Sequence, residues 1–511
     1  MSVPRVLTEP LGGTPLSLAI QRGELANGRP WPESVDAWRD RVRATRQRFD
    51  GGAWLDVLGP AFGSSARLPG LVRAAQTGVV VTTGQQAGLF GGPMLTLVKA
   101  ISARALADSL ERALGVPCAA VFWAATDDAD FAEAASVMIP GTGGARRLSL
   151  HNAPPPGTPM SATRMTGLSE LLSAMERCSG SDGDQLMALL RRSYRDGATV
   201  GDAYVELLRG ILEPLNIAVL DASHPALRRA SRPLLSVALQ RASQIERALD
   251  ENDRGLSARG FSPQVDSIAG LSLVFAYESG IKRRIPTTEA TTVAAATDLG
   301  ANVLLRPIIE ASLIPTVAYA AGPGELAYFA QVPPIASALG VPEPIAVPRW
   351  STMLIEAAID RILDRFSIAP SELRDIDSLM TRLVRGRMPA VVQGPLEDLR
   401  ATAASATTAL RQGGVDDTIV DGLRAQLELR IARGERRIIA ALKRREADLT
   451  RDLGTARGAL YPDGIRQERV LSFIPYLARY GMPLIEQMLM KAGDHATNLI
   501  GASRAESVAV R

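Results

Sequence analysis

The sequence predicts an α/β protein with a doubly wound parallel sheet, followed by an α-helical coiled-coil domain. About five short apolar segments separated by helical stretches indicate buried parallel strands, at 79–82, 117–125, 215–221, 316–321 and 345–348. From residue 351 onward the strand pattern stops and helical patterns take over. Apolar residues there follow one another at alternating intervals of seven and four, at Ile431, Ile438, Leu442, Leu449 and Leu453. This spacing is typical of a coiled-coil seam.

Composition excludes several classes of protein. The 511 residues are 46% hydrophobic and 22% charged, an ordinary soluble composition long enough for two or three domains. The net charge is only +3, and no basic run is interleaved with aromatic residues, so we expect no nucleic-acid partner. Cys118, Cys178 and three scattered histidines fit no disulfide framework or metal site. We find no signal peptide and no membrane-length apolar run, and therefore expect a cytoplasmic protein without a membrane partner.

The stretch from Gly78 to Lys99 is the first candidate site. A strand at 79–82 is followed by a glycine-rich turn at 83–92 and by Pro93, which favours the first position of a helix. A strand, a glycine-rich turn and a helix N-terminus commonly bind anions or nucleotides in open α/β sheets. We expect the substrate to be bound by the first residues of this turn: Thr83, Gly84, Gln85, Gln86 and Gly88. A β-carbon at Gly88 would then crowd the ligand. The turn matches neither a Walker A sequence nor GxGxxG, so a plain connector remains the alternative.

Three carboxylates follow the second predicted strand. Asp127, Asp128 and Asp130 lie where the carboxyl end of that strand would open into a ligand-binding crevice, and they are our catalytic candidates. The alternative is a helix N-cap with acidic residues in the first turn. His224 follows the third strand and precedes Pro225, so it is more readily a cap residue than a chemical group.

A second glycine turn follows the fourth predicted strand. Gly322, Gly324 and Glu325 lie in this turn, and we expect them to bind the substrate. Arg306 and Arg349 are the candidates for pairing with a carboxylate or phosphate, because a guanidinium binds both in a bidentate fork.

The chain divides into three predicted regions. Residues 1–350 form the sheet core, with an N-terminal helix at 33–49 and insertions at about 140–215 and 250–300. The second insertion contains a predicted β-hairpin, 271–277 with 282–286, and a short helix within 287–302. Residues 351–465 form the coiled-coil domain, in which one long helix at 417–453 pairs with 395–412 and favours a homodimer. Residues 466–511 contain two short helices around Gly481 that pack back on the core.

Several segments together resemble one family, the bacillithiol biosynthesis cysteine-adding enzymes (BshC). They are TTGQQAGLFGGP at 82–93, FWAATDDADF at 122–131, RPIIEASLIPTVAYAAGPGELAYFAQ at 306–331, VPRWS at 347–351 and QERVLSFIPYLARYG at 467–481. The resemblance covers essentially the whole chain. It implies a Rossmann-like core, a coiled coil that dimerises, and a ligase that adds L-cysteine to glucosaminyl-malate in the last step of bacillithiol biosynthesis.

The resemblance also leaves questions of mechanism open. This chain has Ala129 where the family typically has a histidine within an acidic run. Direct condensation of a carboxylate with an amine is uphill in water, so we expect activation by ATP with Mg²⁺. The 84–92 turn could hold the nucleotide or the malate carboxylates, and the aspartates could hold an ammonium group or the metal. The alternatives are a nucleotidyl- or glycosyl-type transferase acting on another small anionic metabolite, and a non-catalytic dimeric binding protein.

Overall fold

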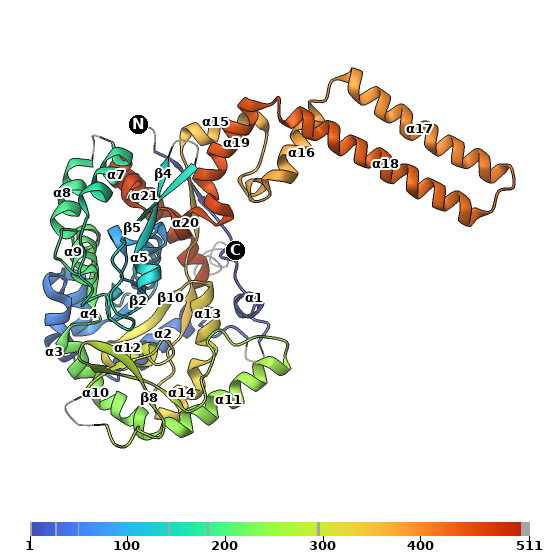
Figure 1. The fold of residues 1–511 in the computed structure, drawn as a ribbon. Helices are drawn as coiled ribbons and strands as arrows, with labels where there is room; N and C mark the ends of the chain where they lie inside the picture. Colours follow the sequence, from blue (N-terminus) through green and yellow to red (C-terminus); the bar gives the residue numbers. More distant parts are fainter. Residues whose placement is uncertain are drawn as a thin grey trace, which may run out of the picture. The chain divides into compact units, whose positions relative to one another are not determined.

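The computed structural model describes residues 3–25, 28–49, 51–141, 144–180, 183–293 and 297–501. The chain divides into two compact units. The α/β unit comprises the described residues of Met1–Ile139, Arg146–Leu354 and Glu468–Arg511. The helical unit comprises those of Pro140–Ala145 and Ile355–Gln467. Figure 1 labels many of the elements of both units.

The α/β unit is built on a five-stranded parallel sheet, as the sequence predicts. Its order is β11 (Ala346–Pro348), β10 (Thr316–Ala321), β2 (Val79–Gln86), β3 (Cys118–Ala125) and β6 (Ile217–Asp221). The chain runs outward from β2 through β3 to β6 and then returns to place β10 on the other side of β2 (Figure 1). The direction of winding therefore reverses between β2 and β10, and ligands of open α/β sheets bind at such a point.

Both faces of the sheet are buried. In β2, Val79 and Val81 belong to one apolar core, and Val80 belongs to a second core on the opposite face. Helices α5 (Met94–Leu114) and α21 (Ile474–Leu499) pack against each other on the first face. Helices α3 (Ala53–Phe62) and α4 (Pro69–Thr77) cover the second. Strands buried on both sides explain why the sequence shows apolar runs here rather than alternation.

Strand β2 is longer than predicted. It continues through Thr83, Gly84, Gln85 and Gln86, which the sequence analysis placed in a turn. Gly84 is required by the sheet, because a β-carbon there would lie 2.8 Å from the carbonyl oxygen of Trp123 in β3. The turn itself is Ala87–Pro93, with a 3₁₀ turn η2 at Leu89–Gly91, and Pro93 is the N-cap residue of α5.

The first insertion contains a hairpin and three helices. The hairpin pairs β4 (Ser136–Gly141) with β5 (Gly144–Ser149), and the helices are α7 (Ser169–Ser179), α8 (Asp184–Ser193) and α9 (Val200–Leu212). Two helices then follow β6, namely α10 (Pro225–Gln240) and α11 (Ala242–Ala258).

The second insertion is a small antiparallel sheet. The predicted hairpin is confirmed as β7 (Leu271–Glu278) with β8 (Ile281–Pro286). The prediction of a helix within 287–302 is wrong where the structure describes that segment, because Asp298–Ala301 forms strand β9 on the other edge of β7. Pairing with β7 buries Leu299, and this tertiary contact outweighs the helical propensity of the alanine-rich sequence. Residues 294–296 lie outside the described residues.

The remaining elements of the α/β unit surround these sheets. Strand β1 (Arg5–Thr8) pairs with β12 (Thr352–Ile355). Further helices of this unit are α1 (Pro15–Arg22), α2 (Val35–Arg46), α6 (Phe131–Ala134), α12 (Arg306–Leu313), α13 (Pro323–Phe329), α14 (Val332–Leu339) and α20 (Gln467–Val470). Helix α21 has a kink at Gly481, whose φ of 51° is non-helical, where the sequence analysis expected a break between two short helices.

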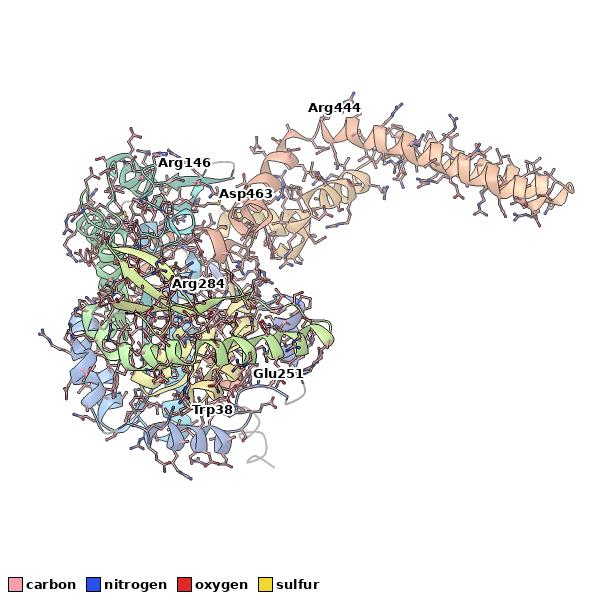
Figure 2. All side chains as sticks on the ribbon, turned by 60° about the horizontal axis from the view of Figure 1, so that its bottom comes forward. Trp38, Arg146, Glu251, Arg284, Arg444 and Asp463 are labelled. Carbon is pink, nitrogen blue, oxygen red and sulfur yellow. The ribbon has the colours of Figure 1, made fainter. Side chains whose placement is uncertain are left out.

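The helical unit contains α15 (Ala357–Phe366), α16 (Ile376–Gly386), α17 (Ala390–Gln412), α18 (Asp417–Lys443) and α19 (Ala447–Leu460). Helices α17 and α18 form a long hairpin (Figure 1). The prediction of one helix over 417–453 is wrong, because α18 ends at Lys443 and α19 starts at Ala447. Arg444, labelled in Figure 2, lies at this break. Two backbone hydrogen bonds close this turn: the Arg445 amide donates to the Leu442 carbonyl at 2.9 Å, and the Glu446 amide donates to the Lys443 carbonyl at 3.2 Å. No helix in the described ranges is long and apolar enough to span a membrane.

Candidate active site

A cavity of about 660 Å³ opens at the carboxyl ends of β2, β3 and β10, where the winding of the sheet reverses. All of its lining residues belong to the α/β unit. Ten residues that the sequence analysis proposed as site residues line it: Gly84, Gln85, Gln86, Asp127, Asp128, Arg306, Gly322, Gly324, Glu325 and Arg349. The topology therefore brings together two glycine segments and an acidic segment that lie far apart in the sequence.

Three proposed site residues do not line the cavity. Thr83 is buried, and its Oγ1 donates a hydrogen bond to the Ala320 carbonyl at 2.9 Å. Asp130 is the N-cap of the short helix α6 (Phe131–Ala134) and accepts a bond from the Glu133 amide at 3.1 Å. For Asp130 the structure thus agrees with the capping alternative.

Gly88 lies in the buried turn after β2. Its carbonyl accepts a hydrogen bond from the Tyr194 hydroxyl at 2.6 Å, and that hydroxyl accepts one from the Gly91 amide at 3.0 Å. The Met94 amide, at the start of α5, donates to the Leu471 carbonyl at 2.7 Å. These donors are therefore used within the protein. Within the protein itself a β-carbon at Gly88 would be tolerated, because the backbone is extended with φ of −144° and the nearest atom would lie 3.6 Å from that β-carbon; crowding of a ligand by it stays a prediction.

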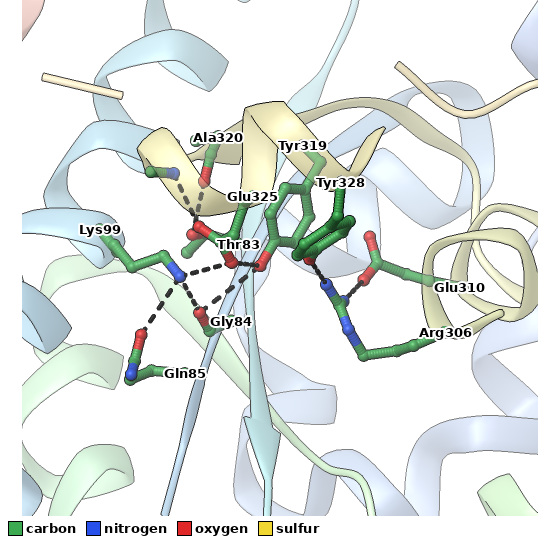
Figure 3. A network of polar contacts seen from close by, with 11 residues as sticks. Thr83, Gly84, Gln85, Lys99, Arg306, Glu310, Tyr319, Ala320, Glu325 and Tyr328 are labelled. Atoms are coloured by element: carbon green, nitrogen blue, oxygen red, sulfur yellow. Dashed lines mark hydrogen bonds and ion pairs between the residues drawn. The ribbon is translucent and has the colours of Figure 1, made fainter. Parts of the chain in front are cut away.

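Lys99, which the sequence analysis did not propose as a site residue, lies at the centre of the polar network in Figure 3. Only 3% of its side chain is exposed, and its Nζ contacts Glu325 Oε1 at 2.7 Å, Gln85 Oε1 at 3.2 Å and the Gly84 carbonyl. Glu325 also accepts bonds from the Tyr319 hydroxyl at 2.6 Å and the Gly322 amide at 2.7 Å. Lys99 therefore connects β2 to the start of α13 and orients the Gln85 amide. The signal available in the sequence was the scarcity of lysine, since the chain has four lysines and two of them line the cavity.

Burial and pairing act against each other in this network. Burial lowers the pKa of Lys99, and Glu325 opposes that shift. Burial alone would raise the pKa of Glu325, but the Lys99 charge and the hydrogen bonds from Lys99, Tyr319 and Gly322 outweigh it and lower that pKa. Glu325 is therefore held as a carboxylate beside the Lys99 ammonium.

Arg306 and Arg349 are paired within the protein. Arg306 donates to Glu310 Oε2 at 2.9 Å and to the Tyr328 hydroxyl at 3.0 Å (Figure 3). Arg349 forms a bidentate pair with Glu468 at 2.6 and 3.1 Å, and at most 2% of either side chain is exposed. Ser351 and Thr352 donate the remaining bonds to Glu468. Both arginines line the cavity, but each already has a carboxylate of its own.

The two aspartates in the lining differ from each other. Asp128 accepts bonds on Oδ1 from the Ala129 amide at 2.6 Å and the Asp130 amide at 3.3 Å, and on Oδ2 from Gln86. Asp127 lies 3.7 Å from Lys282 Nζ, and Lys282 also donates to the Asp127 carbonyl at 3.2 Å. Asp128 therefore shapes the turn, whereas the Asp127 carboxylate is the one less constrained by the backbone.

The second insertion supplies a cationic wall that the sequence analysis did not assign to the site. Lys282 and Arg284 of β8, with Arg228 of α10, line the cavity beside Phe275 and Tyr277. In total, seven cationic side chains and four carboxylates line it. This excess of positive charge favours an anionic ligand, and the carboxylates leave room for an ammonium group as well.

The histidines do not contribute to this cavity. His224 Nδ1 accepts a bond from the Ala226 amide at 3.1 Å and caps α10. His495 Nε2 lies 3.0 Å from the Pro348 carbonyl oxygen. Within the described residues, no group of three or more His, Cys, Asp or Glu side chains could hold a metal ion.

Comparison with known proteins identifies the relatives of this chain. The model of the bacillithiol biosynthesis BshC N-terminal Rossmann-like domain matches residues 71–350, and that of the BshC C-terminal coiled-coil domain matches residues 413–498. A relative from Solibacter usitatus, named "Putative cysteine ligase BshC", is 31% identical over 84% of this chain and 87% of its own length. A relative with the same name from Koribacter versatilis is 31% identical over 86% of this chain and 87% of its own length. Another from Salinibacter ruber is 25% identical over 80% of this chain and 80% of its own length.

Proposed function

The chain belongs to the BshC family of bacillithiol biosynthesis, and on this premise we propose that it is a ligase joining L-cysteine to glucosaminyl-malate. The matched family supports the ligase over the transferase and the binding protein that the sequence left open. Both cysteines are free thiols, which suits a reducing cytoplasm as the place of this reaction.

The observation that carries the proposal is the mixed charge of the cavity. Glucosaminyl-malate has two carboxylates and one amine, and cysteine has one of each. Three cations in the lining that lack a close carboxylate, Lys282, Arg284 and Arg228, offer partners for the substrate carboxylates, and the Asp127 carboxylate offers one for an ammonium group. An amide bond forms only when both substrates are held together, and this cavity at the switch point of the sheet is large enough for ligands of that size.

We assign the amine of the sugar to Asp127. Ala129, at the position where the family typically has a histidine, is outside the cavity lining, so the side chain that accepts a proton must come from elsewhere. Asp127 lines the cavity, and Asp128 beside it is held by Gln86 and by backbone amides. Asp127 binds the ammonium form, and it accepts the proton that the nitrogen loses as it bonds to the activated cysteine carboxyl carbon, while the bond from that carbon to the oxygen carrying the activating phosphate group breaks and that group leaves.

ATP with Mg²⁺ is the activating group that this chemistry calls for, because nucleotide activation makes the cysteine carboxyl a better acyl donor. The residues present fit it. Gly322 and Gly324 at the start of α13 line the cavity, and a β-carbon at Gly324 would meet no atom within 4 Å, which leaves room for a ligand beside the backbone. Mg²⁺ that comes with a nucleotide needs only one or two protein carboxylates, and Asp127 and Asp128 line the same cavity.

The test is amide formation from L-cysteine and glucosaminyl-malate, with and without ATP and Mg²⁺, measured by mass spectrometry. Asp127→Asn should lower turnover by about 10²- to 10⁴-fold, the usual contribution of a general base. Asp130→Asn is the matched control, because Asp130 caps α6 outside the cavity and its loss should leave turnover unchanged. No product with any nucleotide, despite binding of both substrates, would favour a binding protein. Full turnover by Asp127→Asn would contradict the role of Asp127.

The helical unit supports a second part of the proposal, a homodimer formed through α17 and α18. This hairpin leaves large apolar side chains exposed, including Val391 at 83%, Ile419 at 65%, Leu399 at 55% and Leu429 at 50%. A second copy of the same hairpin would cover them. Light scattering should show a dimer that Ile419→Asp with Leu429→Asp converts to a monomer. A monomeric parent protein would contradict this part.

A further inference from the structure

Six of the seven cationic side chains that line the cavity fall into two groups, and Arg469 belongs to neither. The paired cations are Lys99, Arg306 and Arg349, which come from the helices and strands around the main sheet. The hairpin cations are Lys282 and Arg284 of β8, together with Arg228 of α10, which packs against β7. The two groups differ in what neutralises them, and this difference assigns a ligand to one of them.

Each paired cation has a carboxylate within 3 Å. Lys99 contacts Glu325 at 2.7 Å, Arg306 contacts Glu310 at 2.9 Å, and Arg349 contacts Glu468 at 2.6 Å. Glu310 and Glu468 are 2% exposed and Glu325 is 20% exposed, so these pairs are shielded from water. Their positive charge is therefore compensated before any ligand arrives.

The hairpin cations are poorly compensated. Lys282 and Arg228 reach their nearest carboxylates, Asp127 and Asp298, only at 3.7 and 3.6 Å. Among the described residues, Arg284 forms no ion pair with a carboxylate, and its buried Nε has no hydrogen-bond partner, as is also true of the Nε atoms of Arg228 and Arg349. Burial also lowers the pKa of Arg284, as expected where no carboxylate lies close to a partly buried guanidinium.

The hairpin presents these cations to the cavity by strand alternation. Lys282 and Arg284 are two residues apart on β8 and both line the cavity, whereas Arg283 between them does not. Arg283 instead pairs with Glu278 at 2.7 Å and Glu289 at 3.3 Å. Arg284 is labelled on the hairpin in Figure 2.

Aromatic rings support the hairpin cations without neutralising them. Lys282 Nζ lies 4.6 Å from the ring centre of Phe275, and the Arg228 guanidinium lies 4.4 Å from that of Tyr277. Such cation–π contacts orient a cation but leave its full charge available to an anion. The pattern of oriented, desolvated and uncompensated cations is that of a preformed anion site.

We propose that Lys282, Arg284 and Arg228 bind the two carboxylates of the malyl group of the sugar substrate, an assignment that rests on the proposed function. Side chains two residues apart on one strand face stand roughly 6–7 Å apart at their bases, a spacing that suits two separate carboxylates. Asp127 lies beside Lys282 and would attract the ammonium group of the same sugar. The hairpin thus selects a ligand with a dicarboxylate next to an amine.

Calorimetric titration of Arg284→Gln with glucosaminyl-malate, with L-malate alone and with ATP tests the assignment. Loss of a hydrogen-bonded charge should weaken the binding of glucosaminyl-malate and of malate about 10- to 100-fold and leave the affinity for ATP unchanged. Arg283→Gln is the matched control on the adjacent position and should alter none of the three affinities. Arg284→Lys should recover part of the loss because it keeps the charge without the fork. Lys282→Gln is a second, independent variant in case Arg284→Gln does not fold.

The outcomes separate this inference from the proposed function. Parent-like affinity for both dicarboxylates in Arg284→Gln and Lys282→Gln would overturn the inference while leaving the ligase reaction standing. If these two variants instead lose affinity for ATP, the hairpin binds the nucleotide, and the inference is overturned as well. Malate binding that depends on Arg284, without any binding of glucosaminyl-malate by the parent protein, would support the dicarboxylate site and contradict the proposed substrate.

Discussion

The two sides of the cavity use the same residue types for different purposes. On the sheet side, Arg349 is fully buried and forms a bidentate pair with Glu468 at 2.6 and 3.1 Å, although its Nε has no hydrogen-bond partner among the described residues. On the hairpin side, Arg284 is partly buried, and its Nε has no partner among the residues that the structure describes. A cavity-lining arginine is therefore not by itself a ligand-binding residue. What distinguishes the two cases is whether a carboxylate of the protein already lies within hydrogen-bonding distance.

Glu468→Gln should have the largest effect, because it leaves the buried Arg349 guanidinium without its counter-charge. We expect a loss of about 3–5 kcal/mol in the free energy of unfolding, measured from urea denaturation followed by circular dichroism. Glu176→Gln breaks the exposed pair with Arg191 and is the matched control, with an expected loss of at most about 1 kcal/mol. Equal effects of the two substitutions would remove the distinction between the sides.

The pH dependence of stability should report the same pair. Burial would raise the pKa of Glu468, but Arg349 and the bonds from Thr352 and Ser351 outweigh it and lower that pKa in the folded protein. A lowered carboxyl pKa stabilises the fold above the unfolded value of about 4.3, and this stability is lost as pH falls through the folded pKa. Melting temperatures of the parent and of Glu468→Gln should therefore converge as pH is lowered from 7 to 3. If the difference in melting temperature between the two proteins stays constant with pH, the pKa of Glu468 is not lowered in the folded protein.

Arg284→Gln should have a small or opposite effect on stability. Removing a partly buried charge that has no close carboxylate should raise the free energy of unfolding by about 0 to 1 kcal/mol. Thermal denaturation of the ligand-free protein measures it. A loss of more than about 2 kcal/mol would mean that Arg284 is a structural residue like Arg349.

The smallest expected effect is that of salt on the two sides of the cavity. Raising the ionic strength from about 0.05 to 0.5 M should weaken malate binding several-fold, because salt screens the attraction between malate in solution and the hairpin cations, which lack close carboxylates. The loss of unfolding free energy in Glu468→Gln should change little with salt, because both partners of that pair are buried. Malate binding that is insensitive to salt would argue against an electrostatic dicarboxylate site.

The sequence predicted the fold through features that are local in the chain. Apolar runs at β2, β3, β6, β10 and β11 and the change to helices after residue 351 are visible without any tertiary information. Because the carboxyl ends of parallel strands converge, motifs at strand ends could be placed together, and Gln85, Asp127 and Gly322 do line one cavity.

Partner identity could not be predicted in the same way. Glu468 lies 119 residues from Arg349, and nothing in either local sequence indicates that they meet. Gly84 was assigned to a ligand because glycine signals close approach, but the atom that approaches is the Trp123 carbonyl of the next strand. The sequence predicted a hairpin of 271–277 with 282–286, and only the packing of its second strand shows that Lys282 and Arg284, but not Arg283, line the cavity.

The pair of Arg349 and Glu468 also bears on how the protein is made. Arg349 lies just before the chain leaves the α/β unit, and Glu468 is the first residue after it returns. During synthesis, the whole helical unit therefore emerges from the ribosome before the residues that close the α/β unit. Until Ile474–Leu499 follows, α5 lacks the helix that packs on it, and its apolar surface stays exposed on the nascent chain. The buried ion pair can form only at this last stage, so it marks the completion of the fold rather than its beginning.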